Sequence, residues 1–116
     1  MEMTPGRAFY QRQIEALETY DLKTIRAQYD ENATLVNYNE VIKGREAIAN
    51  YFKSYLASLG FLKLKSTDRF METDDSIFFE ATVETQLGVA QVYDVFMLRD
   101  GKATYHFAGI ISPRSA

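Results

Sequence analysis

Hydrophobic positions recur at helical spacing in the first quarter of the chain. Thr4-Pro5 has the residue types of a helix N-terminus, and the apolar positions that follow predict a helix over residues 5–19. Asp21 has the residue type of a second N-cap. Leu22, Ile25 and Tyr29 then share one face, which predicts a second, shorter helix that is broken by the polar residues from Asp30 onward.

The stretch ENATLVNYNEVIKGREAI, residues 31–48, changes pattern twice. Leu35 and Asn37 alternate as in a strand. The chain then turns through Asn and Glu residues and runs back to Gly44. A third helix is predicted after Gly44, because Ile48, Tyr51, Phe52, Tyr55 and Leu59 recur on one side. Gly60 has the residue type that ends helices in a left-handed conformation.

The second half of the chain has the pattern of a sheet. Four runs are rich in β-branched and aromatic residues: FLKLKSTDRFM, SIFFEATVET, VAQVYDVFML and KATYHFAGII. Asp100-Gly101 between the last two is a strong hairpin signal. The sequence therefore predicts one α+β domain over residues 1–116, with three N-terminal helices packed on a curved, mainly antiparallel β-sheet that forms a cone.

The run QVYDVFML is apolar on both of its alternating faces. Such a strand needs a partner on each side, and the helices can cover only one of them. We therefore expect a homodimer that forms through the outer face of the sheet.

Composition adds limits on the function. The chain is 47% hydrophobic with 8 Tyr and 8 Phe in 116 residues, which is enough bulk for a core and for a cavity that binds a small apolar molecule.

A net charge of −3 argues against nucleic acid or an anionic membrane as a partner, and no run approaches the ~20 apolar residues of a membrane span. With no Cys and no N-terminal apolar run, we expect a cytoplasmic location. We expect no cofactor and no metal site, because the single His has no suitably spaced ligands beside it.

The order of elements, together with YDENATLVNYNEVIKGREAIANYF and FMLRDGKATYHFAG, resembles the nuclear transport factor 2-like superfamily over nearly the whole chain. The nearest branches are the SnoaL-like polyketide cyclases and the ketosteroid isomerases. The resemblance implies a cystatin-like cone; the superfamily contains isomerases, cyclases, dehydratases, epoxide hydrolases and binding proteins, so the fold alone does not give the activity.

The ketosteroid isomerases use a Tyr, an Asp base and a protonated Asp. In this sequence the corresponding positions hold Gln13, Asn37 and Asp94. Asn37 cannot abstract a proton, so steroid isomerisation by that mechanism is not expected. In the epoxide hydrolase branch an Asn close to the Asn37 position holds water, but that branch also has an Arg where this chain has Val92. A carotenoid-binding branch has a similar helix start but relies on Trp, which this chain lacks.

Asp94 and His106 are the predicted catalytic residues. Asp94 lies on an apolar strand, so burial is expected to raise the pKa of its carboxyl; it is either a general acid or base, or a structural carboxylate held by a neighbour. His106, the single histidine, shares a strand face with Ala108 and Ile110 and can transfer protons near neutral pH if that face lines the cavity. A hydrogen-bonded structural role is its alternative.

Asn37, Gln13, Tyr29 and Tyr51 are the predicted substrate-binding residues. Asn37 can orient a carbonyl or a water, or instead close the local turn. Gln13 is a polar residue in an apolar helix stripe, which reaches the cavity or caps a sheet edge. The tyrosines are expected in the core or the cavity wall, with partners for their hydroxyls.

Three hypotheses follow from the sequence. The first is a cofactor-free isomerase, cyclase or dehydratase that acts on a small apolar carbonyl compound through Asp94. The second is a non-catalytic protein that binds an apolar ligand, because one polar group in an apolar pocket serves binding as well as chemistry. The third is a dimeric interaction module with no small-molecule role.

Overall fold

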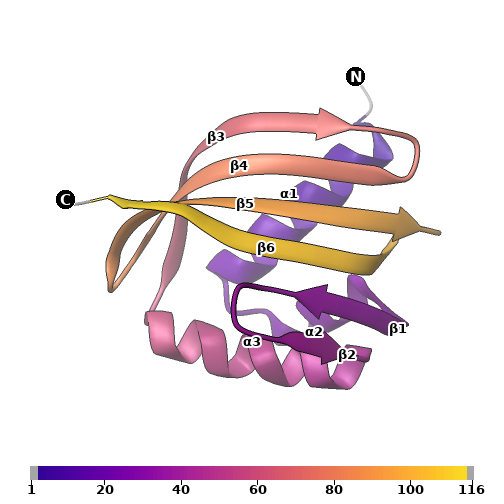
Figure 1. The fold of residues 1–116 in the computed structure, drawn as a ribbon, viewed down its shortest axis with the longest axis horizontal. Helices are drawn as coiled ribbons and strands as arrows, with labels where there is room; N and C mark the ends of the chain where they lie inside the picture. The colour runs from indigo at the N-terminus through magenta and orange to yellow at the C-terminus, as the bar shows by residue number, and fades with distance from the viewer. Residues whose placement is uncertain (1–2, 115–116) are drawn as a thin grey trace.

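The computed structural model describes residues 3–114, which form three helices and a six-stranded sheet (Figure 1). The elements in chain order are α1 Pro5–Glu18, α2 Leu22–Ala27, β1 Tyr29–Val36, β2 Val41–Lys43, α3 Arg45–Leu59, β3 Leu62–Glu72, β4 Ser76–Thr85, β5 Gly88–Arg99 and β6 Lys102–Arg114. The predicted α+β class and the order of helices and strands are confirmed.

The predicted helix starts are confirmed by their caps. The Thr4 hydroxyl accepts a hydrogen bond from the Arg7 backbone N–H at 3.2 Å, and Asp21 accepts one from the Thr24 N–H at 3.1 Å. Each bond satisfies a backbone donor that the first turn of a helix leaves free.

One boundary differs from the prediction. The second helix ends at Ala27, and Tyr29 opens β1 instead of continuing the helix. The Ala103 N–H donates to the Gln28 carbonyl at 2.8 Å, and Tyr29 lies opposite Ala103 in the sheet. Pairing with β6, 74 residues further along the chain (103 minus 29), overrides the local helical pattern.

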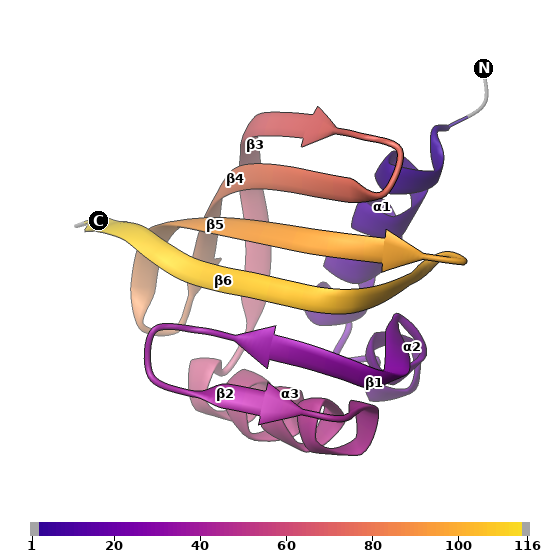
Figure 2. The ribbon, with the colours of Figure 1, turned by 45° about the vertical axis from the view of Figure 1, so that its right-hand side comes forward.

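The strand order is β2-β1-β6-β5-β4-β3. Strands β3 to β6 form an antiparallel meander, whereas β1 runs parallel to β6, so that the first and last strands meet at the centre of the sheet (Figures 1 and 2). The predicted hairpin at Asp100-Gly101 is present, with φ values of 54° and 78°. Positive φ at both positions is the geometry of a two-residue turn whose twist matches its strands.

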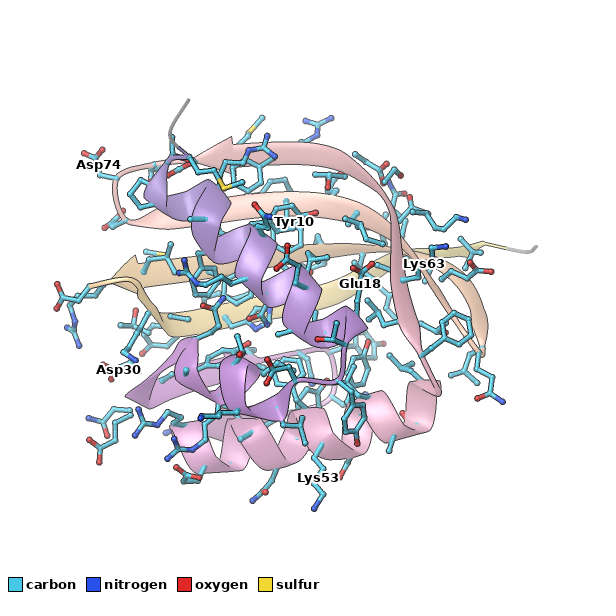
Figure 3. The ribbon with its side chains drawn as sticks, turned by 180° about the vertical axis from the view of Figure 1, so that it is seen from behind. Tyr10, Glu18, Asp30, Lys53, Lys63 and Asp74 are labelled. Atoms are coloured by element: carbon cyan, nitrogen blue, oxygen red, sulfur yellow. The ribbon has the colours of Figure 1, made fainter. Side chains whose placement is uncertain are left out.

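The helices cover one face of the sheet. Figure 3 shows α1 crossing that face, with Tyr10 between the helix and the strands. The ring centroids of Tyr10 and Phe79 of β4 lie 4.4 Å apart. Those of Phe9 and Phe96 of β5 lie 4.9 Å apart in an edge-to-face arrangement. These aromatic contacts fix α1 on the concave side of the sheet and close one end of the cone.

The opposite face of the sheet carries no helix among the described residues, as Figures 1 and 2 show. Strand alternation and register place Tyr93, Val95 and Met97 of β5 on this face beside Tyr105 and Phe107 of β6, and Tyr93 also borders the cavity described below. The three aromatic side chains are 37%, 47% and 38% exposed for Tyr93, Tyr105 and Phe107. We call these five residues the outer patch.

No helix within residues 3–114 combines the length and the apolar character needed to cross a membrane.

Candidate functional site

A cavity of about 450 Å³ lies between α1, α3 and the concave face of the sheet. Most of its walls are apolar, with contributions from Leu35, Phe79, Val83 and Val92. Among the described residues that line it, Asp94 is the sole carboxylate, and there is no lysine or arginine. The cavity therefore places one acidic group in a largely apolar enclosure.

Asp94 and His106 form a close pair across two neighbouring strands. His106 Nε2 lies 2.6 Å from Asp94 Oδ1, and the two side chains are 4% and 17% exposed for His106 and Asp94. Burial raises the pKa of the Asp94 carboxyl above its ordinary value, and the hydrogen bond and charge of His106 offset part of that rise. The structure brings the two predicted catalytic residues together at the cavity wall.

The His106 ring is held in a stack of aromatic rings. Phe96 stacks on it with ring centroids 3.8 Å apart, and Phe52 and Tyr29 lie nearly parallel to it at 6.5 Å and 6.0 Å. A ring packed in this way cannot rotate freely, so the direction of its two nitrogens is fixed.

Tyr29 lies behind His106 and does not line the cavity. Its side chain is completely buried, and its hydroxyl oxygen lies 2.8 Å from His106 Nδ1. The sequence suggested that Tyr29 would contact the substrate directly. In the structure it contacts His106 instead, because β1 starts at Tyr29 and turns the ring toward β6. Gln13 lines the cavity at 2% exposure, and its Nε2 donates to the Tyr29 oxygen at 3.3 Å.

Gln28 extends this polar chain toward the surface. Its Nε2 donates to the Phe9 carbonyl at 2.9 Å and to Gln13 Oε1 at 3.3 Å, and its Oε1 accepts from Arg12 Nε at 3.0 Å. Gln28 is 4% exposed and was not singled out from the sequence, because it follows the second helix outside any apolar stripe.

Asn37 follows the end of β1 and lines the cavity. Its Oδ1 accepts from the backbone N–H groups of Asn39 at 2.8 Å and Glu40 at 3.0 Å, so its oxygen closes the turn to β2. Its Nδ2 donates to the Tyr51 hydroxyl oxygen at 3.2 Å. Of the two roles left open by the sequence, the oxygen takes the turn, and the amide nitrogen bonds to Tyr51 at the cavity wall.

Tyr51 and Tyr55 stand one turn apart on α3 and line the cavity. Their rings are stacked with centroids 5.6 Å apart and planes 10° apart. Desolvation raises the pKa of Tyr51, and it raises that of Tyr55 to about 12, so both hydroxyls keep their protons at neutral pH. Tyr55 was predicted only as core or wall; its spacing of four from Tyr51 was the signal that both face one side.

Comparison with known proteins agrees with this fold. Residues 10–106 match the SnoaL-like domain. An NTF2-like protein from Anabaena variabilis superimposes with a TM-score of 0.83 at 18% identity, over 95% of this chain and 90% of that one. A SnoaL-like protein of unknown function from Burkholderia thailandensis has a TM-score of 0.81 at 16% identity, over 97% and 99%. A protein from Kribbella flavida described as a candidate ketosteroid isomerase has a TM-score of 0.81 at 14% identity, over 97% and 82%. Among curated proteins, none has a sequence significantly similar to this chain. At these identities the structural likeness shows the fold alone.

Proposed function

The chain belongs to the SnoaL-like domain family, and we propose that its cavity binds a small, uncharged, largely apolar carbonyl compound and catalyses cofactor-free proton transfer on it. Asp94 is the acid or base of this reaction, and His106 assists it. The reaction class is that of an isomerase, a cyclase or a dehydratase whose first step moves a proton from the carbon next to a carbonyl group.

The observation that carries the proposal is the arrangement of hydrogen-bond donors around one acceptor. The side-chain oxygens of Gln13 and Asn37 already accept hydrogen bonds, from Gln28 and from the turn to β2, and each amide nitrogen carries a second N–H beyond the one that it donates to Tyr29 or Tyr51. Tyr51 accepts from Asn37 and keeps its own proton to donate. Asp94 is then the single carboxylate among the described lining residues, in a wall whose amide N–H groups and Tyr51 hydroxyl can donate to a bound carbonyl oxygen.

This arrangement supports a stepwise proton transfer. The Asp94 carboxylate takes a proton from the carbon beside the carbonyl, and the electrons of that C–H bond move to the carbonyl oxygen to give an enolate. The Tyr51 hydroxyl donates to this oxygen, and donation to developing charge in a dry site lowers the barrier. Asp94 then returns the proton to carbon, either at the same atom or at a conjugated one. The raised pKa of Asp94 makes it a stronger base than a solvated carboxylate.

The walls restrict the charge and size of the substrate. No lysine or arginine among the described lining residues can neutralise a phosphate or a carboxylate, and burying an unpaired anion next to Asp94 is costly. A volume of about 450 Å³ lies in the range of small-molecule sites, ~300–1,000 Å³. These limits favour a neutral ketone of two or three rings.

Hydrogen exchange tests the proposal without knowledge of the natural substrate. Bicyclic and tricyclic enolisable ketones are incubated with the protein in D₂O, and proton NMR follows the loss of the signal next to the carbonyl. We expect exchange with the wild type and none above background with Asp94→Asn. Asp74→Asn is the matched control, because it removes the same charge from the β3–β4 turn, outside the cavity (Figure 3). Undiminished exchange by Asp94→Asn would refute the proposal.

A non-catalytic binding protein is the second candidate, favoured by one feature. Asp94 already has a hydrogen-bond partner in His106, so the cavity can hold an apolar ligand without any reaction. Chemical-shift changes at cavity residues on addition of a ketone that never exchanges its protons would support this candidate over the enzyme.

We also propose that the outer patch pairs two copies of the chain. Five apolar side chains on adjacent strands leave an aromatic surface on a sheet face without a helix, and burying such a surface against its own copy removes it from water. Phe107→Arg is expected to give a monomer in size-exclusion chromatography with light scattering. Phe61→Arg, a change at a more exposed phenylalanine between α3 and β3, is expected to leave the dimer intact. A monomeric wild type would refute the pairing.

A further inference from the structure

The buried amides behind the site can be oriented from their partners alone. The Phe9 carbonyl only accepts, so the atom of Gln28 beside it, at 2.9 Å, must be the amide nitrogen. The other end of Gln28 then presents its oxygen to Arg12, whose Nε–H only donates. The Phe9 carbonyl and the Arg12 guanidinium therefore require the same orientation of the Gln28 amide.

This orientation passes along the chain to Tyr29. The second N–H of Gln28 reaches Gln13 Oε1, so Gln13 presents its own N–H groups to the Tyr29 oxygen at 3.3 Å. The Tyr29 oxygen accepts from Gln13 and still has a proton to donate. Among the described residues, its remaining hydrogen-bond neighbour is His106 Nδ1 at 2.8 Å.

The buried position of Tyr29 decides where that proton goes. Its side chain is 0% exposed, so a hydroxyl proton without an acceptor would be left in a dry core, which disfavours the arrangement by about tenfold or more. The proton therefore points to Nδ1, which has to be the bare nitrogen of the ring. The ring proton then lies on Nε2, 2.6 Å from Asp94 Oδ1.

We propose that Tyr29 is a positioning residue that holds His106 in the tautomer with its proton on Nε2, so that the histidine always donates to Asp94. The donors run in one direction from Arg12 through Gln28, Gln13, Tyr29 and His106. Asp94 Oδ1 accepts the last of these bonds, which leaves Oδ2 for the proton of a substrate; this last step rests on the proposed function. The opposite tautomer would face the carboxylate with a lone pair and would strand the Tyr29 proton.

The single histidine makes the tautomer directly measurable. Long-range proton–nitrogen correlation spectra of the ¹⁵N-labelled protein, without ligand, distinguish a protonated ring nitrogen from a bare one. We expect wild-type His106 to show a protonated Nε2 and a bare Nδ1, with about tenfold or more excess of this tautomer. Tyr29→Phe removes one of the two groups that favour this tautomer, the other being Asp94, so its excess is expected to fall and both nitrogen signals to move toward each other.

Tyr10→Phe is the matched control. It removes the hydroxyl of another tyrosine of the same core, one that is bonded to Thr67 at 2.5 Å instead of to the histidine, so both nitrogen signals should stay at their wild-type positions. A wild-type spectrum with the proton on Nδ1 would overturn the proposal, and this measurement decides even if Tyr29→Phe does not fold. Unchanged signals in folded Tyr29→Phe would overturn it too.

The spectra contain no substrate, so this test and the exchange test fail separately. If His106 has the expected tautomer but no ketone exchanges its protons, the positioning role of Tyr29 stands and the proposed enzyme activity is refuted. If ketone exchange depends on Asp94 but the ring proton of His106 lies on Nδ1, the enzyme activity stands and the positioning role of Tyr29 is refuted.

Discussion

Asp94 is expected to make the free energy of unfolding of the wild type fall, relative to that of Asp94→Asn, as the pH rises. Burial raises the pKa of the carboxyl above its ordinary value of 3.8, because the charged form loses water in the cavity wall. The folded state therefore holds its proton more tightly than the unfolded state does. Stability falls with pH wherever the folded state holds more protons, which here is between 3.8 and the folded pKa.

The size of the effect is limited by the single proton involved. Within that window the free energy of unfolding of the wild type falls, relative to Asp94→Asn, by at most about 1.4 kcal/mol per pH unit. Outside the window the difference between the two proteins is constant. The asparagine also changes the bond to His106, so the slope within the window is the quantity to compare and not the absolute difference.

Urea unfolding of both proteins at intervals from pH 3 to pH 8 measures this slope. Subtracting one protein from the other cancels the other carboxyl groups. Asp21→Asn provides a control of opposite sign: hydrogen bonds from Thr24 lower the Asp21 pKa, so the wild type has its advantage above pH 3.8 and loses it as the pH falls through the folded pKa. A difference between wild type and Asp94→Asn that is flat over the whole range, or that favours the wild type as pH rises, would refute the reasoning.

Three further substitutions test the geometry. Asn37→Ala removes the acceptor for two backbone N–H groups and is expected to cost ~1–2 kcal/mol in thermal unfolding, whereas Asn37→Asp keeps that acceptor and most of the stability; equal losses would contradict the turn role. Tyr51→Phe keeps the stack on Tyr55 but removes a donor, so ketone exchange should slow by roughly 10- to 1,000-fold, and an unchanged rate would exclude Tyr51 from the reaction. Gly109→Ala places a methyl group 2.4 Å from the Tyr93 ring, which must move; we expect a loss of ~1–3 kcal/mol by urea unfolding, and wild-type stability would show that the ring yields freely.

The parts of the fold that the sequence predicted are those with a local cause. Thr4 and Asp21 cap helices through bonds to residues three positions away, and Asp100-Gly101 makes its turn through its own backbone angles. The parallel pairing of β1 with β6 has no such local signal, because the contact joins distant parts of the chain. For that reason the sequence placed Tyr29 on a helix, and the structure places it on a strand.

The candidate site divides in the same way. Alternation gave Asp94 and His106 each a face on its own strand, but the register of β5 with β6 is what brings the two faces to the same side of the sheet; the functional roles of both residues stay predictions. The choice for Asn37 between ligand and turn depended on backbone N–H groups that a sequence pattern does not locate. The hydrogen bonds between the buried amides of Gln28 and Gln13 were not predicted, because the role of Gln28 depends on its contacts with Phe9 and Gln13, which are distant in the sequence.

The central place of β6 also affects how the protein is made. Until this last strand is synthesised, β1 has only β2 as a neighbour, and β5 ends the meander with an open edge. The nascent chain therefore carries two unpaired strand edges, each able to join another chain, up to the point where β6 inserts between them. We expect a ribosome-bound chain that stops before Lys102 to aggregate or to recruit chaperones, even though α1, α2, α3 and 101 of the 116 residues are already present.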